Sequence, residues 1–268
     1  PTPAAVTAAL ERIIRETDPV KLHGYTSAQG DMAVRAKIAG SIEERFGFPA
    51  DKDLIYMTCG AAASLTVTLN ALINCGDEII IPAPFFPEYR VFAENAGARV
   101  VTVQCRKPDF QLDIKAIGSA VTEKTKAIII NSPNKPTGAV FSPDTIKALS
   151  DMLCKKQAEY GTDIYIIADE PYRELSYGAE VPYIPKYYAN TVICYSYSKS
   201  LSLPGERIGY IFIPEGAADC RKLYAAVCGA GRALGFVCAP SLMQYTVAEC
   251  TDALPDVSAY KKNRDLLF

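Results

Sequence analysis

The stretch Lys-Ala-Ile-Ile-Ile-Asn-Ser-Pro-Asn-Lys-Pro-Thr-Gly at residues 126–138 places an apolar run directly before a polar loop. The β-branched residues within 126–130 predict a strand that is buried on both faces. Two prolines, two asparagines and a glycine in 131–138 then fix a loop with polar side chains at the end of that strand. A long helix is predicted to follow at 142–160, because Ser142-Pro143-Asp144 is a typical helix start.

The same succession of apolar strand and helix runs through the rest of the chain. Further strands are predicted at 53–58, 78–82, 99–103, 163–168, 191–195 and 208–213. Further helices are predicted at 3–16, 31–46, 60–74, 87–95 and 216–229. Continuous apolar strands that alternate with helices indicate an α/β fold with three layers, α/β/α, around a mostly parallel central sheet. Ligands bind such sheets beyond the carboxyl ends of the strands, so functional residues are expected at that edge.

Composition excludes several classes of protein. Of the 268 residues, 49% are hydrophobic and 22% are charged, which is close to the globular average and unlike a disordered chain or a coiled coil. The formal net charge is −2, so no nucleic-acid partner is expected. No apolar run reaches the roughly 18 residues that a membrane-spanning helix needs, so no membrane association is expected.

Cysteine and histidine usage narrows the choice further. The nine cysteines are scattered without CxxC spacing, which indicates reduced thiols and a cytoplasmic protein. His23 is the only histidine, and this disfavours a multi-histidine metal site or a Ser-His-Asp triad. We therefore expect no bound metal.

Three other strand ends carry residues that suit a ligand. Gly60-Ala61-Ala62 opens a helix with small residues, which lets backbone N–H groups approach an anion, although tight helix–sheet packing explains the same residues. Phe86 could stack on a flat ring or simply fill the core. Asp169, at the end of an apolar strand, is either a helix cap or the counter-ion of a buried cation.

The last strand end carries Ser196-Tyr197-Ser198-Lys199, and Arg207 opens the next strand. A lysine in this place can form an imine once desolvation and neighbouring cations lower its pKa, whereas a solvated lysine is the simpler explanation for Lys199 alone. The order and spacing of all these segments together are not explained by chance. From about Tyr25 to Arg207, the chain resembles the class I/II, aspartate-aminotransferase-like, pyridoxal-phosphate-dependent aminotransferases of fold type I.

The resemblance implies three catalytic residues. Lys199 matches the lysine that holds pyridoxal phosphate in a covalent imine and then moves the α-proton of the substrate. Asp169 matches the aspartate that keeps the pyridine nitrogen protonated, so that the ring withdraws electrons. Tyr172 matches the phenol that hydrogen-bonds the 3′ oxygen of the ring.

The resemblance also implies the remaining cofactor contacts. Phe86 corresponds to the aromatic residue that stacks on the ring. The phosphate ligands are implied to be Gly60, Ala61, Ala62, Ser196, Ser198 and Arg207. Tyr25 matches a tyrosine that reaches the phosphate of the neighbouring subunit, so a homodimer is expected, although Tyr25 could also pack locally.

The loop after the strand at 126–130 departs from the family. The family has asparagine directly before Pro-Thr-Gly, where this chain has Lys135 preceded by Asn134. Three arrangements are open: Lys135 points into the site and favours an anionic 3′ oxygen, the loop slides so that Asn134 bonds this oxygen, or Lys135 faces solvent and the site is impaired. We favour the second.

The resemblance divides the chain into three segments. Residues 1–50 are expected to be N-terminal helices, 51–250 the cofactor-binding large domain, and 251–268 the start of a linker helix to a small domain. The chain begins with Pro1 and ends without the family's segment that carries the carboxylate-binding arginine. We therefore expect a piece of a longer protein, with the small domain largely missing.

The favoured function is transfer of an amino group between an amino acid and a 2-oxo acid in a ping-pong cycle. A carbon–sulfur β-lyase of the same fold needs the same three residues, Lys199, Asp169 and Tyr172, so the motifs do not separate the two reactions. The aminotransferase-like effector domain of a transcription regulator is a third interpretation, and a structural protein with a vestigial site is a fourth.

Overall fold

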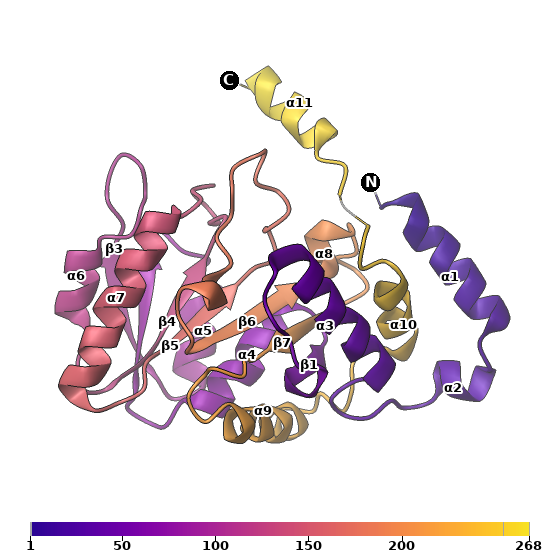
Figure 1. Ribbon diagram of the computed structural model, residues 1–268, viewed down its shortest axis with the longest axis horizontal. Coiled ribbons are helices and arrows are strands. Elements are labelled where there is room, and N and C mark those ends of the chain that lie inside the picture. The colour runs from indigo at the N-terminus through magenta and orange to yellow at the C-terminus, as the bar shows by residue number, and fades with distance from the viewer. Residues whose placement is uncertain (1, 254, 268) are drawn as a thin grey trace.

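The computed structural model describes residues 2–253 and 255–267. In this part of the chain, seven strands form one central sheet (Figure 1): β1 Ile55–Thr58, β2 Glu78–Ala83, β3 Arg99–Gln104, β4 Thr125–Asn131, β5 Tyr165–Asp169, β6 Thr191–Ser196 and β7 Gly209–Phe212. The helices around it are α1 Ala4–Glu16, α2 Pro19–His23, α3 Met32–Phe46, α4 Ala61–Leu72, α5 Glu88–Asn95, α6 Ile114–Ala120, α7 Pro143–Tyr160, α8 Tyr197–Ser200, α9 Cys220–Ala233, α10 Ser241–Glu249 and α11 Ser258–Leu267.

The strand order across the sheet is β1-β7-β6-β5-β4-β2-β3, and only β7 runs antiparallel to its neighbours. The register pairs Asn131 of β4 with Asp169 of β5, and Asp169 with Cys194 of β6. The polar residues that follow these three strands therefore meet at one edge of the sheet, as the parallel arrangement predicts.

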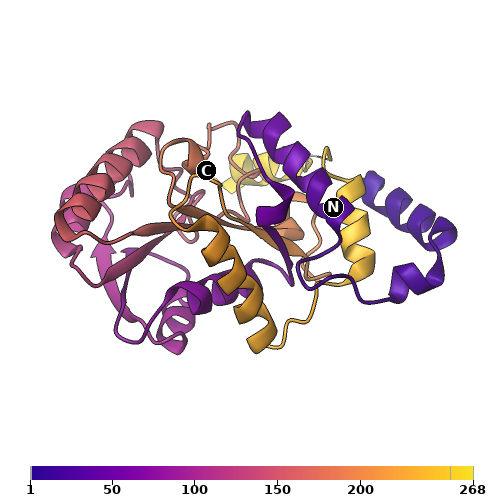
Figure 2. The ribbon, with the colours of Figure 1, turned by 60° about the horizontal axis from the view of Figure 1, so that its bottom comes forward.

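Helices cover both faces of the sheet (Figure 2). Because successive strand residues face opposite sides, Ile128 and Ile130 pack in the core shared with α1, α3, α6, α7 and α10. Ala127 and Ile129 pack in the second core, shared with α4, α5 and α9. These two cores confirm the predicted α/β/α layers and the mostly parallel sheet.

Capping residues account for the ends of the best-predicted helices. Asp31 caps α3, because its carboxylate accepts hydrogen bonds from two backbone N–H groups of the first turn, and Gly47 ends this helix with a left-handed φ of 55°. Ser142 caps α7 by accepting from the backbone N–H of Thr145. The sequence signals at these ends are local, and for that reason they could be identified without the fold.

Three predicted elements begin two or more residues later than expected, one of them being the strand predicted from residue 163, which begins at Tyr165. The helix predicted from residue 216 begins at Cys220, because Asp219 has a left-handed φ of 49° that a helix does not continue through. The strand predicted from residue 53 begins at Ile55, because a 3₁₀ turn over Lys52–Leu54 is capped by the side chain of Asp51. Helices α2, α6, α8 and α10 were not predicted, whereas α11 lies within the segment 251–268 that was expected to start a linker helix.

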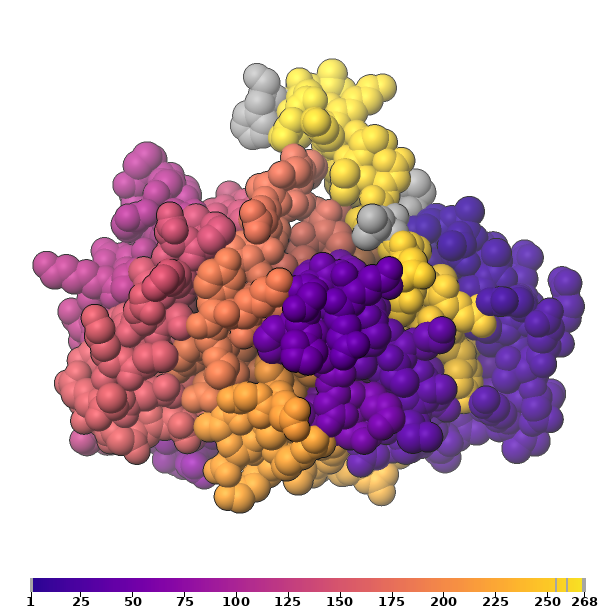
Figure 3. All heavy atoms as spheres, viewed as in Figure 1, coloured from indigo at the N-terminus to yellow at the C-terminus, as the bar shows by residue number. Residues whose placement is uncertain are grey.

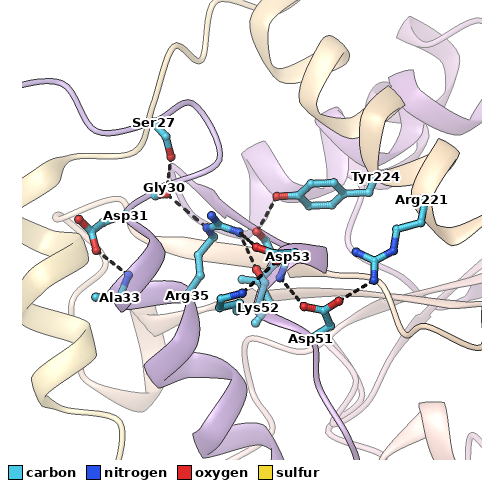
Figure 4. Close-up of polar contacts among 11 residues, drawn as sticks. Ser27, Gly30, Asp31, Ala33, Arg35, Asp51, Lys52, Asp53, Arg221 and Tyr224 are labelled. Carbon is cyan, nitrogen blue, oxygen red and sulfur yellow. Dashed lines mark hydrogen bonds and ion pairs between the residues drawn. The ribbon is translucent and has the colours of Figure 1, made fainter.

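The loop between α2 and α3 is tied to the body of the molecule (Figure 4). The Arg35 guanidinium donates to the backbone oxygen of Gly30 at 3.3 Å and to that of Lys52 at 2.7 Å. The Ser27 hydroxyl also donates to the Gly30 oxygen, at 2.5 Å. This loop, which carries Tyr25, is therefore held against the start of β1.

The C-terminal helix α11 projects from the body of the molecule (Figure 3). Its Arg264 guanidinium lies 5.3 Å from the ring centroid of Tyr177. The proposed segments 1–50 and 251–268 include positions 1, 254 and 268, which lie outside the described residues. Among the helices of the described residues, none is long and apolar enough to cross a bilayer.

Candidate functional site

A cavity of about 140 Å³ lies at the carboxyl ends of β4, β5 and β6, beside the start of α4. Ten of the thirteen residues predicted for the site line it: Ala61, Ala62, Phe86, Lys135, Asp169, Tyr172, Ser196, Ser198, Lys199 and Arg207. These residues come from segments spread over almost 150 positions of the chain. The fold brings these separate segments together around one cavity.

One end of the cavity suits an anion. The N-terminus of α4 opens there, and a helix N-terminus carries free N–H groups and a partial positive charge. Gly60 precedes this helix with a φ of 89°, and a Cβ at this position would lie 2.9 Å from Nη2 of Arg207. Glycine is therefore required both by the backbone conformation and by the close approach of the guanidinium.

Arg207 and two serines complete this end. Arg207 itself has a left-handed φ of 53°, which is costly for a residue with a side chain and is found mainly where function requires it. The hydroxyls of Ser196 and Ser198 lie 2.8 Å apart, and the Ser198 backbone N–H donates to Ser196 Oγ. A guanidinium, two hydroxyls and a helix N-terminus form a set of donors typical of a phosphate site.

A buried carboxylate, that of Asp169, also lines the cavity. Asp169 is only 5% exposed, and its Oδ2 accepts a hydrogen bond from the Tyr89 hydroxyl at 2.5 Å. Its Oδ1 is buried and has no hydrogen-bond partner. Burial raises the pKa of Asp169 to about 7, and the Tyr89 hydrogen bond opposes this rise.

Lys199 and Tyr172 line the same cavity. Lys199 is on the single turn α8, which Ser196 caps by accepting from the Ser198 N–H. Burial and the neighbouring Asp169 carboxylate raise the pKa of Tyr172, so its phenol remains a hydrogen-bond donor at neutral pH. An amine, a phenol and a carboxylate thus line one small cavity.

The residues present fit pyridoxal phosphate. Asp169 Oδ1 is a buried acceptor without a partner, and a protonated pyridine nitrogen is the kind of donor that it lacks. Phe86 supplies an aromatic face in the same cavity, held edge-on by Tyr89 with ring centroids 5.6 Å apart. The phosphate donors lie in the same cavity as this carboxylate, so ring and phosphate could be bound together.

The loop at 131–138 presents Lys135, rather than Asn134, to the cavity. Asn134 lines a second, more open hollow next to it, and its side-chain oxygen is taken by the N–H and hydroxyl of Thr137. The loop has therefore not slid to bring Asn134 into the position that we favoured. Lys135 lines both the cavity and this hollow, and it is an exposed residue.

Gly60 and Tyr25 also lie outside the cavity lining. Gly60 lies against the Arg207 guanidinium, and Tyr25 is 89% exposed. Sequence reasoning missed Tyr89, which lies three residues after Phe86. Tyr89 is one aromatic residue in a helix of mixed charged and apolar residues, and no sequence signal linked it to Asp169, 80 positions later.

Comparison with known proteins gives the family. Residues 1–267 match the model of the family "Aminotransferase class I and II". The chain belongs to this family, as its resemblance predicted. Members of the family generally depend on pyridoxal phosphate. Within residues 2–253 and 255–267, no three histidine, cysteine, aspartate or glutamate side chains gather in a way that could hold a metal ion.

Similar proteins carry aminotransferase names. The crystal structure of an amino transferase from Eubacterium rectale has a TM-score of 0.98 and 54% identity, and covers all of this chain and 68% of its own. A probable aspartate aminotransferase of Methanocaldococcus jannaschii is 29% identical over all of this chain and 69% of its own length. A putative aminotransferase of Bacillus subtilis is 31% identical over 89% of this chain but only 60% of its own length. The described fold corresponds to the large domain of such enzymes.

Proposed function

We propose that the chain carries the pyridoxal-phosphate site of an aminotransferase that exchanges the amino group of an amino acid with the oxo group of a 2-oxo acid in a ping-pong cycle. The observation that carries this proposal is the buried Asp169 Oδ1 without a partner, in one cavity with Lys199 and Arg207. Amino-acid and 2-oxo-acid substrates are proposed from the family alone. The choice of amino acid is left to the experiment below.

Each end of the cavity has a distinct role in this proposal. Arg207, the two serines and the α4 N-terminus bind the phosphate, and Phe86 covers one face of the ring. Asp169 holds a proton on the ring nitrogen. Pyridoxal phosphate, when bound, supplies a covalent carrier for the amino group and an electron-withdrawing ring.

Lys199 and Tyr172 are the residues proposed to take part in the reaction at the cofactor. With pyridoxal phosphate bound, the Lys199 amine would hold it covalently between turnovers and, once released, would serve as the base for the α-proton of the substrate. Tyr172 would donate a hydrogen bond to the 3′ oxygen of the ring. Both side chains line the same cavity as Asp169.

A second copy of the chain is the proposed partner. Four large apolar side chains are exposed within residues 14–32: Ile14, Val20, Tyr25 and Met32. Their grouping on one segment favours contact with another protein surface. Tyr25 is thereby proposed to reach the site of the partner copy. The free thiols of all nine cysteines favour a cytoplasmic location for this dimer.

Cofactor attachment tests the first part of the proposal. The protein is loaded with pyridoxal phosphate, reduced with borohydride and digested, and the labelled peptide is identified by mass spectrometry. We expect the label on Lys199 and its loss in Lys199→Ala, with Lys126→Ala as a control lysine outside the cavity. Labelling spread over surface lysines would contradict the proposal.

A half-reaction screen tests the chemistry. Each amino acid is added alone, and the absorbance change to the pyridoxamine form is followed. Stoichiometric oxo acid with trapped pyridoxamine phosphate supports transfer, whereas continued release of pyruvate and ammonia supports the β-lyase.

Complementation tests the dimer. Tyr25→Ala and Lys199→Ala variants are mixed under conditions that exchange subunits. Recovery of activity in the mixture is expected if Tyr25 and Lys199 of different copies form one site, and no recovery argues that Tyr25 acts within its own copy or not at all.

A further inference from the structure

Lys135 is the residue of the cavity that departs from the family, and its position gives it a specific role. The inference rests on the proposed function, because it concerns how this chain treats bound pyridoxal phosphate. Lys135 and Tyr172 are shared by the cavity and by the neighbouring hollow, so both lie where the two openings join.

The backbone of Lys135 is fixed relative to Asp169. The Asn131 side-chain oxygen accepts the Lys135 backbone N–H at 2.8 Å, while the Asn131 side-chain nitrogen donates to the Asp169 backbone oxygen at 2.9 Å. One buried amide thus joins the loop to the end of β5. The start of the Lys135 side chain is therefore set by the strand that carries the ring-nitrogen ligand.

The ammonium group of Lys135 lies over an aromatic ring of the cavity. Its Nζ is 4.5 Å from the ring centroid of Phe86, the residue proposed to stack on the cofactor. Within the part of the chain that the structure describes, no carboxylate oxygen lies within 4.0 Å of this Nζ. The charge is thus available to an anion that enters the cavity.

More cationic than anionic side chains line the cavity. The titratable or charged groups that face the cavity are Tyr89, Lys135, Asp169, Tyr172, Lys199 and Arg207. Arg207 is assigned to the phosphate and Asp169 to the ring nitrogen. Asn134, the neutral residue that could have replaced the family's asparagine, lines the neighbouring hollow and not the cavity, and its side-chain oxygen accepts from Thr137. Lys135 is the cationic residue that lines both the cavity and the neighbouring hollow, as Tyr172 does.

We propose that Lys135 is a cationic ligand of the anionic 3′ oxygen of bound pyridoxal phosphate, in place of the neutral amide of the family. A cation at this oxygen favours the state of the bound cofactor that carries one proton fewer. The pH midpoint of the cofactor's absorbance change should therefore lie lower than it would with a neutral side chain.

Spectrophotometric titration of the loaded protein without substrate tests this role. We expect Lys135→Met and Lys135→Asn to raise the midpoint by about one pH unit, while Lys135→Arg stays near wild type because it keeps the charge. Lys126→Asn is the matched control, since its Nζ lies 5.5 Å from the Tyr165 ring centroid, at the other end of β4. An unmoved midpoint in Lys135→Met would overturn the inference.

A binding measurement identifies the atom concerned. Pyridoxal phosphate should bind Lys135→Met about tenfold more weakly than wild type, whereas 3-O-methylpyridoxal phosphate, which has no anionic 3′ oxygen, should bind both equally. Equal losses for both ligands would contradict a role at this oxygen. If wild type binds neither, or if Lys199 is not labelled, the proposed function itself fails, and that outcome is separate from an unmoved midpoint in a protein that does bind the cofactor.

Discussion

Asp169 and Glu170 are neighbours in the sequence, and both are buried, at 5% and 3% exposed. The two carboxylates differ in how completely their hydrogen bonds are satisfied. Glu170 forms a two-point ion pair with Arg173, at 2.7 and 2.5 Å, and the other Arg173 hydrogen bonds go to the backbone oxygens of Val181 and Pro182. Asp169 has one hydrogen bond, from Tyr89, and one oxygen with no partner.

The surroundings of Arg173 explain why this pair is structural. Its guanidinium lies 5.2 Å from the Phe46 ring centroid and 5.4 Å from that of Tyr183. Burial acts to lower the pKa of Arg173, but the Glu170 carboxylate outweighs it, so the pKa is raised and the cation persists. The hydrogen bonds of this buried ion pair are made within the protein, so the pair does not need a ligand as a partner.

Asp169, in contrast, has a buried oxygen without a hydrogen-bond partner. A buried carboxyl group that lacks a partner costs stability, and this cost is recovered only when a donor binds in the cavity. The comparison therefore separates a region built for folding, around Arg173, from a region built for a ligand, around Asp169.

The largest expected effect is on the ligand side. Lys199→Ala should slow the amino-acid half-reaction by about 10³-fold or more, because a positioned base contributes 10²–10⁴-fold to such steps. Stability should change by less than about 0.5 kcal/mol, since the residue lies at the cavity and not in the core. Stopped-flow absorbance and urea unfolding measure the two effects. A rate within tenfold of wild type would contradict the role of Lys199.

On the folding side, breaking the ion pair should cost the most stability. Glu170→Gln should lower the free energy of unfolding by about 3–5 kcal/mol, because it leaves Arg173 as an uncompensated buried cation. Asp109→Asn is the control: it breaks the exposed pair with Arg106 and should cost less than about 1 kcal/mol. Replacing both Glu170 and Arg173 with methionine should restore most of the loss. If Glu170→Gln and Asp109→Asn lowered the free energy of unfolding equally, the buried pair would have no special role in folding.

Asp169→Asn should do the reverse and stabilise the cofactor-free protein at high pH. The folded-state pKa of Asp169 is raised to about 7, so the folded chain holds the proton more tightly than the unfolded chain, whose carboxyl pKa is about 4. This contribution is full below the unfolded pKa and is lost as the pH rises toward 7. Wild type and variant should be equally stable near pH 4, and the variant more stable by about 2–4 kcal/mol at pH 8. Parallel pH profiles in urea unfolding would contradict the prediction.

The smallest expected effect comes from Tyr89→Phe. Loss of the hydroxyl should cost about 1 kcal/mol and raise the pKa of Asp169 further, by less than about one unit, because the hydrogen bond to the carboxylate lowers this pKa. The pH at which the cofactor-free protein loses stability should move up accordingly. Tyr165→Phe is the matched control, since its hydroxyl bonds the Ala218 backbone oxygen away from the cavity. A control that shifts the profile equally would show that the effect is not specific.

Much of the fold and of the site could be predicted because the signals are local. Apolar strands such as 126–130 and caps such as Asp31 act within a few residues, and most of the cofactor motifs lie just after a strand. The starts of β1 and α9 were placed too early because Asp51 and Asp219 impose turns that the apolar pattern does not reveal.

The sequence by itself determined the succession of strands and helices, the family resemblance and most residues that line the cavity. Only the tertiary structure decided that Lys135 rather than Asn134 lies at the cavity, that Tyr89 holds Asp169, and that Glu170 belongs to an ion pair while its neighbour does not. Each of these depends on which groups from distant segments meet in a water-poor interior. A polar atom there either finds a partner or remains free for a ligand, and sequence spacing does not encode which.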